Sequence, residues 1–257
     1  MKEKKVSIYR SDMRRFFISW RFYVSLVVGL LFILRPFFEA YQVWERMSPV
    51  LLLSLPFGSS DFTPFAAIFC VLPFADSFCV DADSNFANSI VLRVGGRRYA
   101  LQRCITVAIS GAVVMGTIVL VTIMSCVFAA GLPETAESAD FMRNTIWARM
   151  NVILTFNGTL FYAGRLLLAA LFGALWALVG LAISTVLTNR YVTLVAPFIL
   201  YQVLWYLLSE SPINPVYLLR GDDQRIPSLA FVVMYQLALI GLCAFAAFRG
   251  IRRKVMI

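Results

Sequence analysis

The chain has 257 residues, of which 60% are hydrophobic and only 14% are charged, and its formal net charge is +9. Soluble globular chains are about 45–50% apolar and about 25% charged, so this composition excludes a soluble domain, a disordered chain and a disulfide scaffold. The sequence predicts an all-α, polytopic membrane protein. It contains no histidine, which excludes Ser-His and Cys-His catalysis and histidine-ligated metal.

The N-terminal segment 6–21 predicts an amphipathic helix that lies on the inner leaflet of the membrane. Its apolar residues recur at spacings of 3, 4, 3 and 4, while most of its arginines fall off that line. The apolar line consists of Val6, Tyr9, Met13, Phe16 and Trp20. The alternative is a charged leader with chance periodicity.

Six long apolar segments predict a bundle of six transmembrane helices. They cover residues 22–38, 62–78, 104–130, 160–187, 192–208 and 227–248. The first is short enough to be compared with a signal peptide, but no small-x-small cleavage site follows it, so we expect a retained span. The run 50–57 contains Pro56 and is too short to span, which indicates an interfacial or re-entrant piece.

The distribution of Lys and Arg predicts that both termini are cytoplasmic. In that orientation 16 of the 23 basic residues lie inside, in the tail 1–21, the loop 79–103, the short connection at Arg190 and the tail 249–257. The segments 39–61, 131–159 and 209–226 become extracellular loops around a membrane domain that covers 22–248. We expect a multi-pass cell membrane protein, and since topology explains the basic excess, nucleic acid is not an expected partner.

The sequence offers no catalytic constellation. Every lysine lies in a terminal tail, Asp61 and Asp76 fall at opposite ends of the second span, and no glycine precedes a lysine, so no Walker A loop exists. We therefore expect no enzyme activity, metal or cofactor in this chain. At the outer ends of spans, Arg35, Glu39 and Arg165 favour snorkelling to the interface over a charged vestibule for substrate.

Small residues follow one face of the fourth span and predict close helix packing. The fourth-span residues are Ala170, Gly173, Ala177, Gly180 and Ser184, and a weaker set in the third span comprises Ala108, Ala112 and Gly116.

The loop 79–103 predicts a short cytoplasmic helix over residues 81–93. Asp81, Asp83, Ser84 and Asn85 are residue types that cap helix N-termini, and the pair Gly95-Gly96 ends the helix. Phe86 and Ile90 share one face, and Arg93 suits the C-terminal turn. This segment is either an ordinary solvated loop or a docking helix.

With this loop, the chain resembles the permease subunits of bacterial type-2 ABC exporters, and the loop looks like that of the small Firmicute-type members. The shared layout is an N-terminal elbow helix, six spans and a cytoplasmic coupling helix between spans two and three. The resemblance implies two separate ATPase subunits that bind ATP and Mg²⁺, and a second permease, identical or similar, that completes the translocation path. It also implies the coupling residues Asp81, Asp83, Asn85, Phe86, Ile90 and Arg93. The acidic-Arg-Gly-Thr stretch of drug and polysaccharide exporters is absent, so the cargo stays open.

Two other functions remain in view. One is a non-transporting membrane immunity or scaffold protein that binds a peptide or partner. The other is an ion-coupled secondary transporter, which the scarcity of mid-span charges and the absence of a visible repeat disfavour.

Overall fold

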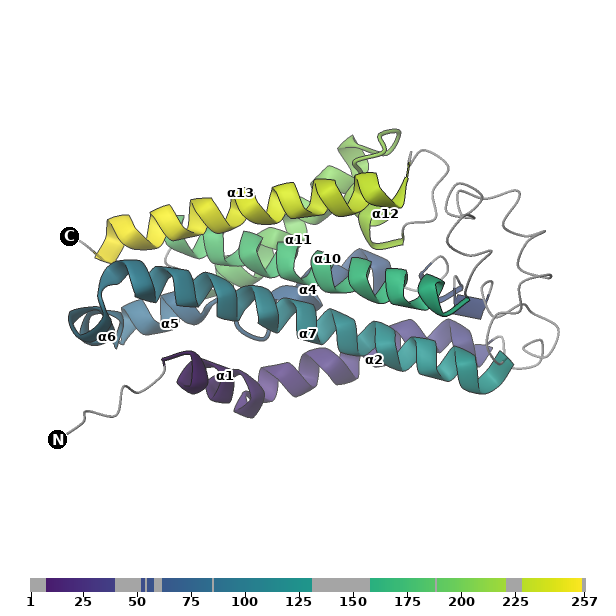
Figure 1. Cartoon of the computed structure of the whole chain (residues 1–257), viewed down its shortest axis with the longest axis horizontal. Coiled ribbons are helices and arrows are strands. Elements are labelled where there is room, and N and C mark those ends of the chain that lie inside the picture. The colour runs from purple at the N-terminus through teal and green to yellow at the C-terminus, as the bar shows by residue number, and fades with distance from the viewer. Residues whose placement is uncertain are drawn as a thin grey trace.

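A computed structural model describes residues 8–39, 52–53, 55–57, 62–84, 86–130, 158–187, 189–220 and 228–255. Every regular element in these ranges is a helix, and the long helices lie side by side along one axis (Figure 1). The helices are α1 (Ile8–Ile18), α2 (Trp20–Glu39), α4 (Phe62–Val71), α5 (Ser77–Asp83), α6 (Phe86–Val94), α7 (Gly96–Ala130), α10 (Gly158–Val186), α11 (Arg190–Leu207), α12 (Pro215–Arg220) and α13 (Leu229–Val255).

Four of these helices, α7, α10, α11 and α13, are long and apolar enough to cross a membrane. The pair α1–α2, bent by 51°, supplies a fifth candidate span if it is counted as one. The expected all-α, multi-pass class is confirmed at this level. Four of the predicted segments, 104–130, 160–187, 192–208 and 227–248, coincide with the four long helices to within a few residues, except that α7 begins eight residues earlier, at Gly96, and α13 continues to Val255.

The predicted second span, 62–78, is not one continuous helix, and in this respect the prediction was wrong. Helix α4 ends at Val71, five turn residues follow, and α5 begins at Ser77. Pro73 explains the break, because it has no N–H to donate to the carbonyl of Phe69 one turn earlier. That carbonyl accepts a hydrogen bond from the hydroxyl of Ser25 in α2 instead, at 2.7 Å.

The predicted N-terminal helix is confirmed as a separate element, although it ends earlier than expected. Helix α1 stops at Ile18, and α2 starts at Trp20 after the bend. Of the predicted apolar line, Phe16 is fully buried against Phe22 and Phe74, whereas Tyr9 and Trp20 are exposed. Val6 lies outside the described residues.

Helix α10 lies at the centre of the bundle, where its small residues allow backbone contact with α7. A Cβ atom added at Gly173 would lie 2.2 Å from the carbonyl oxygen of Gly111, and one added at Gly180 would lie 2.9 Å from side chains of the α4–α5 segment. Two residues of the predicted fourth-span stripe, Gly173 and Gly180, therefore lie at close helix contacts. In the third span the close backbone approach falls at Gly111, whereas a Cβ atom added at Gly116 of the predicted set would lie 4.0 Å from Leu166. Ala108 packs against the core.

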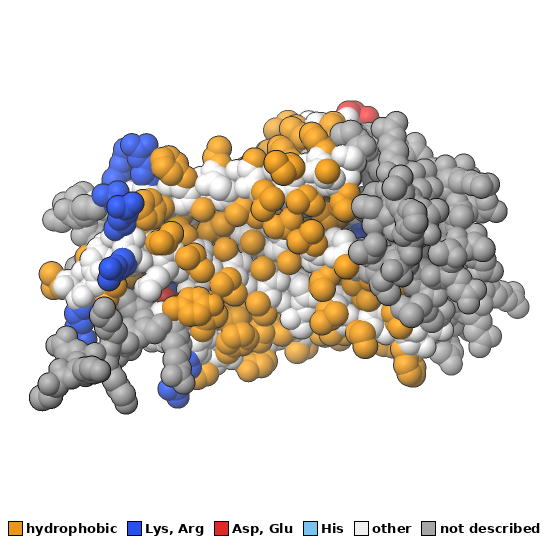
Figure 2. Space-filling model, in the orientation of Figure 1, with side chains coloured by type: hydrophobic (Ala, Val, Ile, Leu, Met, Phe, Trp, Pro, Cys, Tyr) orange, Lys and Arg blue, Asp and Glu red, His pale blue; other side chains and the backbone are white. Residues whose placement is uncertain are grey.

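Basic side chains gather at one end of the bundle, which we call the basic end. Helix α1 begins there and α13 finishes there, and the middle of the visible face is covered by hydrophobic side chains (Figures 1 and 2). The exposed basic residues of this end include Arg93, Arg97, Arg98, Arg253 and Lys254. The predicted tail 249–257 is thus helical as far as Val255.

At the opposite end, only parts of the predicted loops are described. Leu52, Leu53 and Phe57 from the run 50–57 are buried, and α12 lies within the predicted loop 209–226. The segments 40–51, 131–157 and 221–227 lie outside the described residues.

Candidate functional site

At the basic end, Asp81 of α5 lies at the centre of a buried charge network. Its Oδ2 atom accepts hydrogen bonds from the hydroxyl of Tyr99, at 3.0 Å, and from the guanidinium of Arg103. Tyr99 and Arg103 stand one turn apart on α7, so they present to the same side of that helix. The pairing fixes α5 against the first turns of α7.

The same network includes helix α1. Arg15 donates to the other oxygen of Asp81 at 3.1 Å, and Asp12 lies 3.4 Å from a guanidinium nitrogen of Arg103. Asp12 and Phe16, one turn apart, form the inward side of α1. The carboxylate of Asp12 therefore lies beside the buried ring of Phe16. Ion pairs as well as apolar packing hold α1 against α5 and α7.

A second buried carboxylate, Asp76, stands in the turn between α4 and α5. It pairs with Arg21 at the start of α2, at 2.7 Å, and with Arg190 at the start of α11, at 2.9 Å. Asn189 caps α11 by accepting hydrogen bonds from the backbone N–H groups of Tyr191 and Val192, which fixes where Arg190 begins the helix. The segment 72–83 thus contacts four helices through two acids.

The electrostatics of this site favour one arrangement of the helices. Asp12 and Asp81 are balanced by Arg15 and Arg103, so the first cluster carries no net formal charge. Burying a charge is costly unless it is paired and hydrogen-bonded, and removing one partner leaves the other charge uncompensated. Separating α1, α5 and α7 would therefore cost free energy by leaving buried charges unpaired, whereas the intact network contributes little to the net free energy of folding.

The predicted coupling residues do not form one surface. Asp81 is entirely buried and Asp83 is exposed, and both belong to α5 rather than capping the next helix, so their assignment as N-terminal caps was wrong. The following helix, α6, begins at Phe86 and not at residue 81. Ile90 is half-buried against the core, and Arg93 is exposed. Asn85 and the side chain of Phe86 lie outside the described residues.

Among the side chains of α6 that the structure describes, the exposed large apolar one is Leu92, which was missed from the sequence. Its side chain is 89% exposed, next to exposed Arg93. The expected end of the helix is confirmed: Gly95 has a φ of +87°, and its N–H bonds to the carbonyl of Val91. The available signal was helical periodicity, which places residue 92 on a different side of the helix from residue 90.

The outer charges behave differently from one another. Arg35 and Glu39 form an exposed ion pair one turn apart, at 2.9 Å, as expected for interfacial residues. Arg165 is 2% exposed and its guanidinium lies 5.5 Å from the centre of the Phe57 ring. The expectation that Arg165 snorkels to the surface was wrong, because its side chain is buried and packs on the Phe57 ring.

Comparison with known proteins gives no significant match to a family model, a curated protein or a solved structure. The fold and the network define a helical, multi-pass membrane protein with four or five candidate spans.

Proposed function

We propose that this chain is the permease subunit of an ATP-driven ABC exporter, with separate ATPase subunits and a second permease subunit as partners. In this proposal the basic end is cytoplasmic, and the broken α4–α5 segment crosses the membrane as the sixth span. The cargo is left open, and ATP and Mg²⁺ belong to the ATPase.

The observation that carries the proposal is the short helix α6. It protrudes at the basic end between α5 and α7 and exposes Leu92 beside Arg93. An apolar side chain exposed to water on a cytoplasmic helix gains about 1.5–3 kcal/mol when a partner buries it. An ATPase surface with an apolar pocket rimmed by acidic groups fits this pair of side chains.

The charge network supports the coupling step of the proposal. A displacement of α6 is passed to α5, because only two residues separate the end of α5 from the start of α6, and it is passed to α7 across Gly95. Asp81 locks α5 to α7 and α1, while Asp76 links the neighbouring turn to α2 and α11. Packed helices that are joined in this way move as rigid bodies, and alternating access of a transport path requires such motion.

The test is to purify the tagged full chain from its native membrane and identify the chains that stay bound. The proposal predicts a stoichiometric partner with a Walker A sequence, and ATP hydrolysis that disappears when that partner is dissociated. A pure chain bound only to a peptide or to a membrane protein without a nucleotide site would contradict the proposal and favour the immunity or scaffold alternative.

A further inference from the structure

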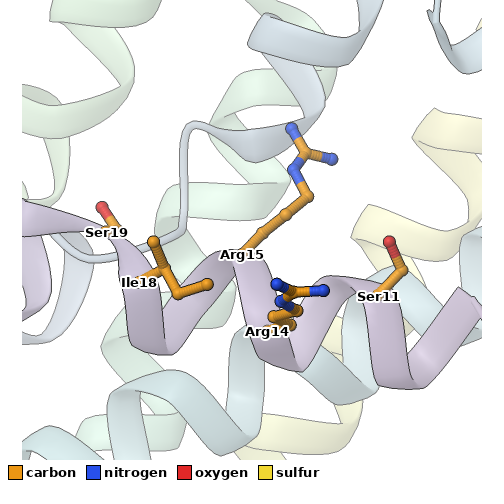
Figure 3. A pocket seen from close by; sticks show the side chains of 5 residues that line it. All are labelled: Ser11, Arg14, Arg15, Ile18 and Ser19. Atoms are coloured by element: carbon orange, nitrogen blue, oxygen red, sulfur yellow. The ribbon is translucent and has the colours of Figure 1, made fainter.

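One side of α1 carries a shallow open depression that borders the charge network and shares Arg15 with it. Its volume is about 480 Å³, within the range of small-ligand sites, about 300–1,000 Å³. The depression is lined by Ser11, Arg14, Arg15, Ile18 and Ser19 (Figure 3). Their spacing of three and four places them along one side of the helix, and in the figure Ser11, Arg15 and Ser19 project in the same direction.

The lining combines positive charge with hydroxyl donors, which is the chemistry that recognises a phosphate group. Arg14 is exposed and forms no ion pair with an acidic residue in the part of the chain that the structure describes. Arg15 reaches from the same depression to Asp81, so a bound anion would lie next to the charge network. A guanidinium supplies paired donors with a geometry that fits phosphate oxygens, and the two serine hydroxyls add neutral donors.

The apolar surroundings indicate that the phosphate belongs to a lipid. Ile18 and Trp20 are 67% and 69% exposed, and Phe17 is also exposed, directly beside the basic lining. Tryptophan and phenylalanine at such positions contact the headgroup and upper acyl region of a bilayer. The 51° bend between α1 and α2 places α1 at the end of a candidate span, where headgroups lie.

We propose that the depression formed by Ser11, Arg14, Arg15, Ile18 and Ser19 binds the phosphate headgroup of an anionic phospholipid. The headgroup phosphate lies between Arg14, Arg15 and the hydroxyl of Ser11, one turn before Arg15, and the acyl chains run along Ile18 and Trp20. This assignment concerns a lipid site and does not depend on an ATPase partner.

The test measures lipid binding to the full chain in detergent by native mass spectrometry, with phosphatidylglycerol and phosphatidylcholine as probes. One basic residue near an anionic surface is worth about a fivefold change in affinity. Arg14→Gln is expected to weaken the tightest phosphatidylglycerol site by about fivefold, whereas the control Arg98→Gln, another exposed arginine of the basic end, leaves it unchanged. Arg15 is not substituted, because it also holds Asp81.

A second pair of variants separates a defined site from a diffuse positive field. Ser11→Ala removes one hydrogen-bond donor without changing charge and is expected to weaken the site by about threefold, whereas Ser89→Ala, at an exposed serine of α6, has no effect. Equal losses for Arg14→Gln and Arg98→Gln, no loss for Ser11→Ala, or no preference for phosphatidylglycerol would overturn the proposal. Displacement of the lipid by inorganic phosphate at equal concentration would also overturn it, by showing a free-anion site.

Discussion

Asp81 and Arg103 form an ion pair at the basic end in which neither side chain is exposed at all. Their elements, α5 and α7, are separated along the chain by α6, the short helix that carries Leu92. The ion pair therefore joins the helices before and after α6, so both ends of the protruding helix are held at the bundle. Tyr99 shares the same carboxylate oxygen and holds it in place.

Neutralising the buried acid is expected to destabilise the protein. Asp81→Asn leaves Arg103 and Arg15 with Asp12 as the remaining acid in the cluster, and breaking a buried pair costs about 3–5 kcal/mol. The matched control is Asp83→Asn, two residues further along the same helix on an exposed side chain. Thermal unfolding in detergent is expected to show a lower Tm for Asp81→Asn only; an equal shift for both variants would refute a structural role for the network.

Helix packing at the centre of the bundle provides a second prediction. Gly173→Ala is expected to lower stability by about 1–3 kcal/mol, because the added methyl group would collide with the backbone of Gly111. The control Gly241→Ala meets open space and is expected to be neutral or to gain up to about 1 kcal/mol from helix propensity. If both variants unfold at the same temperature, α7 and α10 do not make this backbone contact.

The positions of the long helices could be predicted from the sequence because a membrane span requires a long apolar run, which composition alone displays. The same rule failed at residues 62–78, where hydropathy is continuous but Pro73 interrupts the hydrogen bonds. A proline inside an apolar run is visible in the sequence. The decisive fact is that Ser25, 44 residues away, satisfies the freed carbonyl group, and this follows only from the three-dimensional arrangement.

The candidate site was only partly predictable for a related reason. Capping preferences identified Asp81 and Asp83 as a local pair, but one is buried in a network and the other is exposed. The partners of Asp81 come from α1 and α7, and no local pattern links Asp12, Asp81 and Arg103. Periodicity located the N-terminal helix and its phenylalanine, yet it did not indicate that an acid on the same side faces the core.

The orientation of the chain is open to direct test by cysteine labelling. A membrane-impermeant maleimide applied to intact cells is expected to leave Arg97→Cys unmodified, because Arg97 lies at the basic end, and to modify Glu210→Cys, which is exposed near the opposite end. The result should reverse in inside-out vesicles. Labelling of position 97 from outside intact cells would contradict the proposed topology and indicate the opposite orientation.

The native Cys79 is expected to stay silent in such experiments. Its side chain is fully buried, so a maleimide does not reach the sulfur while the segment stays folded. Its sulfur also lies 3.5 Å from the hydroxyl of Thr193. Mass spectrometry of the wild-type chain after maleimide treatment at pH 8 checks this expectation; rapid modification of Cys79 in folded protein would show that the segment opens.

The central claim is that α6 docks an ATPase, and a site-specific cross-link at Leu92 tests it most directly. A short bifunctional reagent on Leu92→Cys, in native membranes, is expected to join the chain to a protein with a Walker A sequence. Leu207→Cys, 70% exposed at the far end of α11, is the matched control and is expected to give no such product. The predicted result is a cross-link from position 92 to a nucleotide-binding subunit, which disappears when a reagent with a single reactive group replaces the bifunctional one. A cross-link from position 92 only to lipid, or only to a protein without a nucleotide site, would contradict the account.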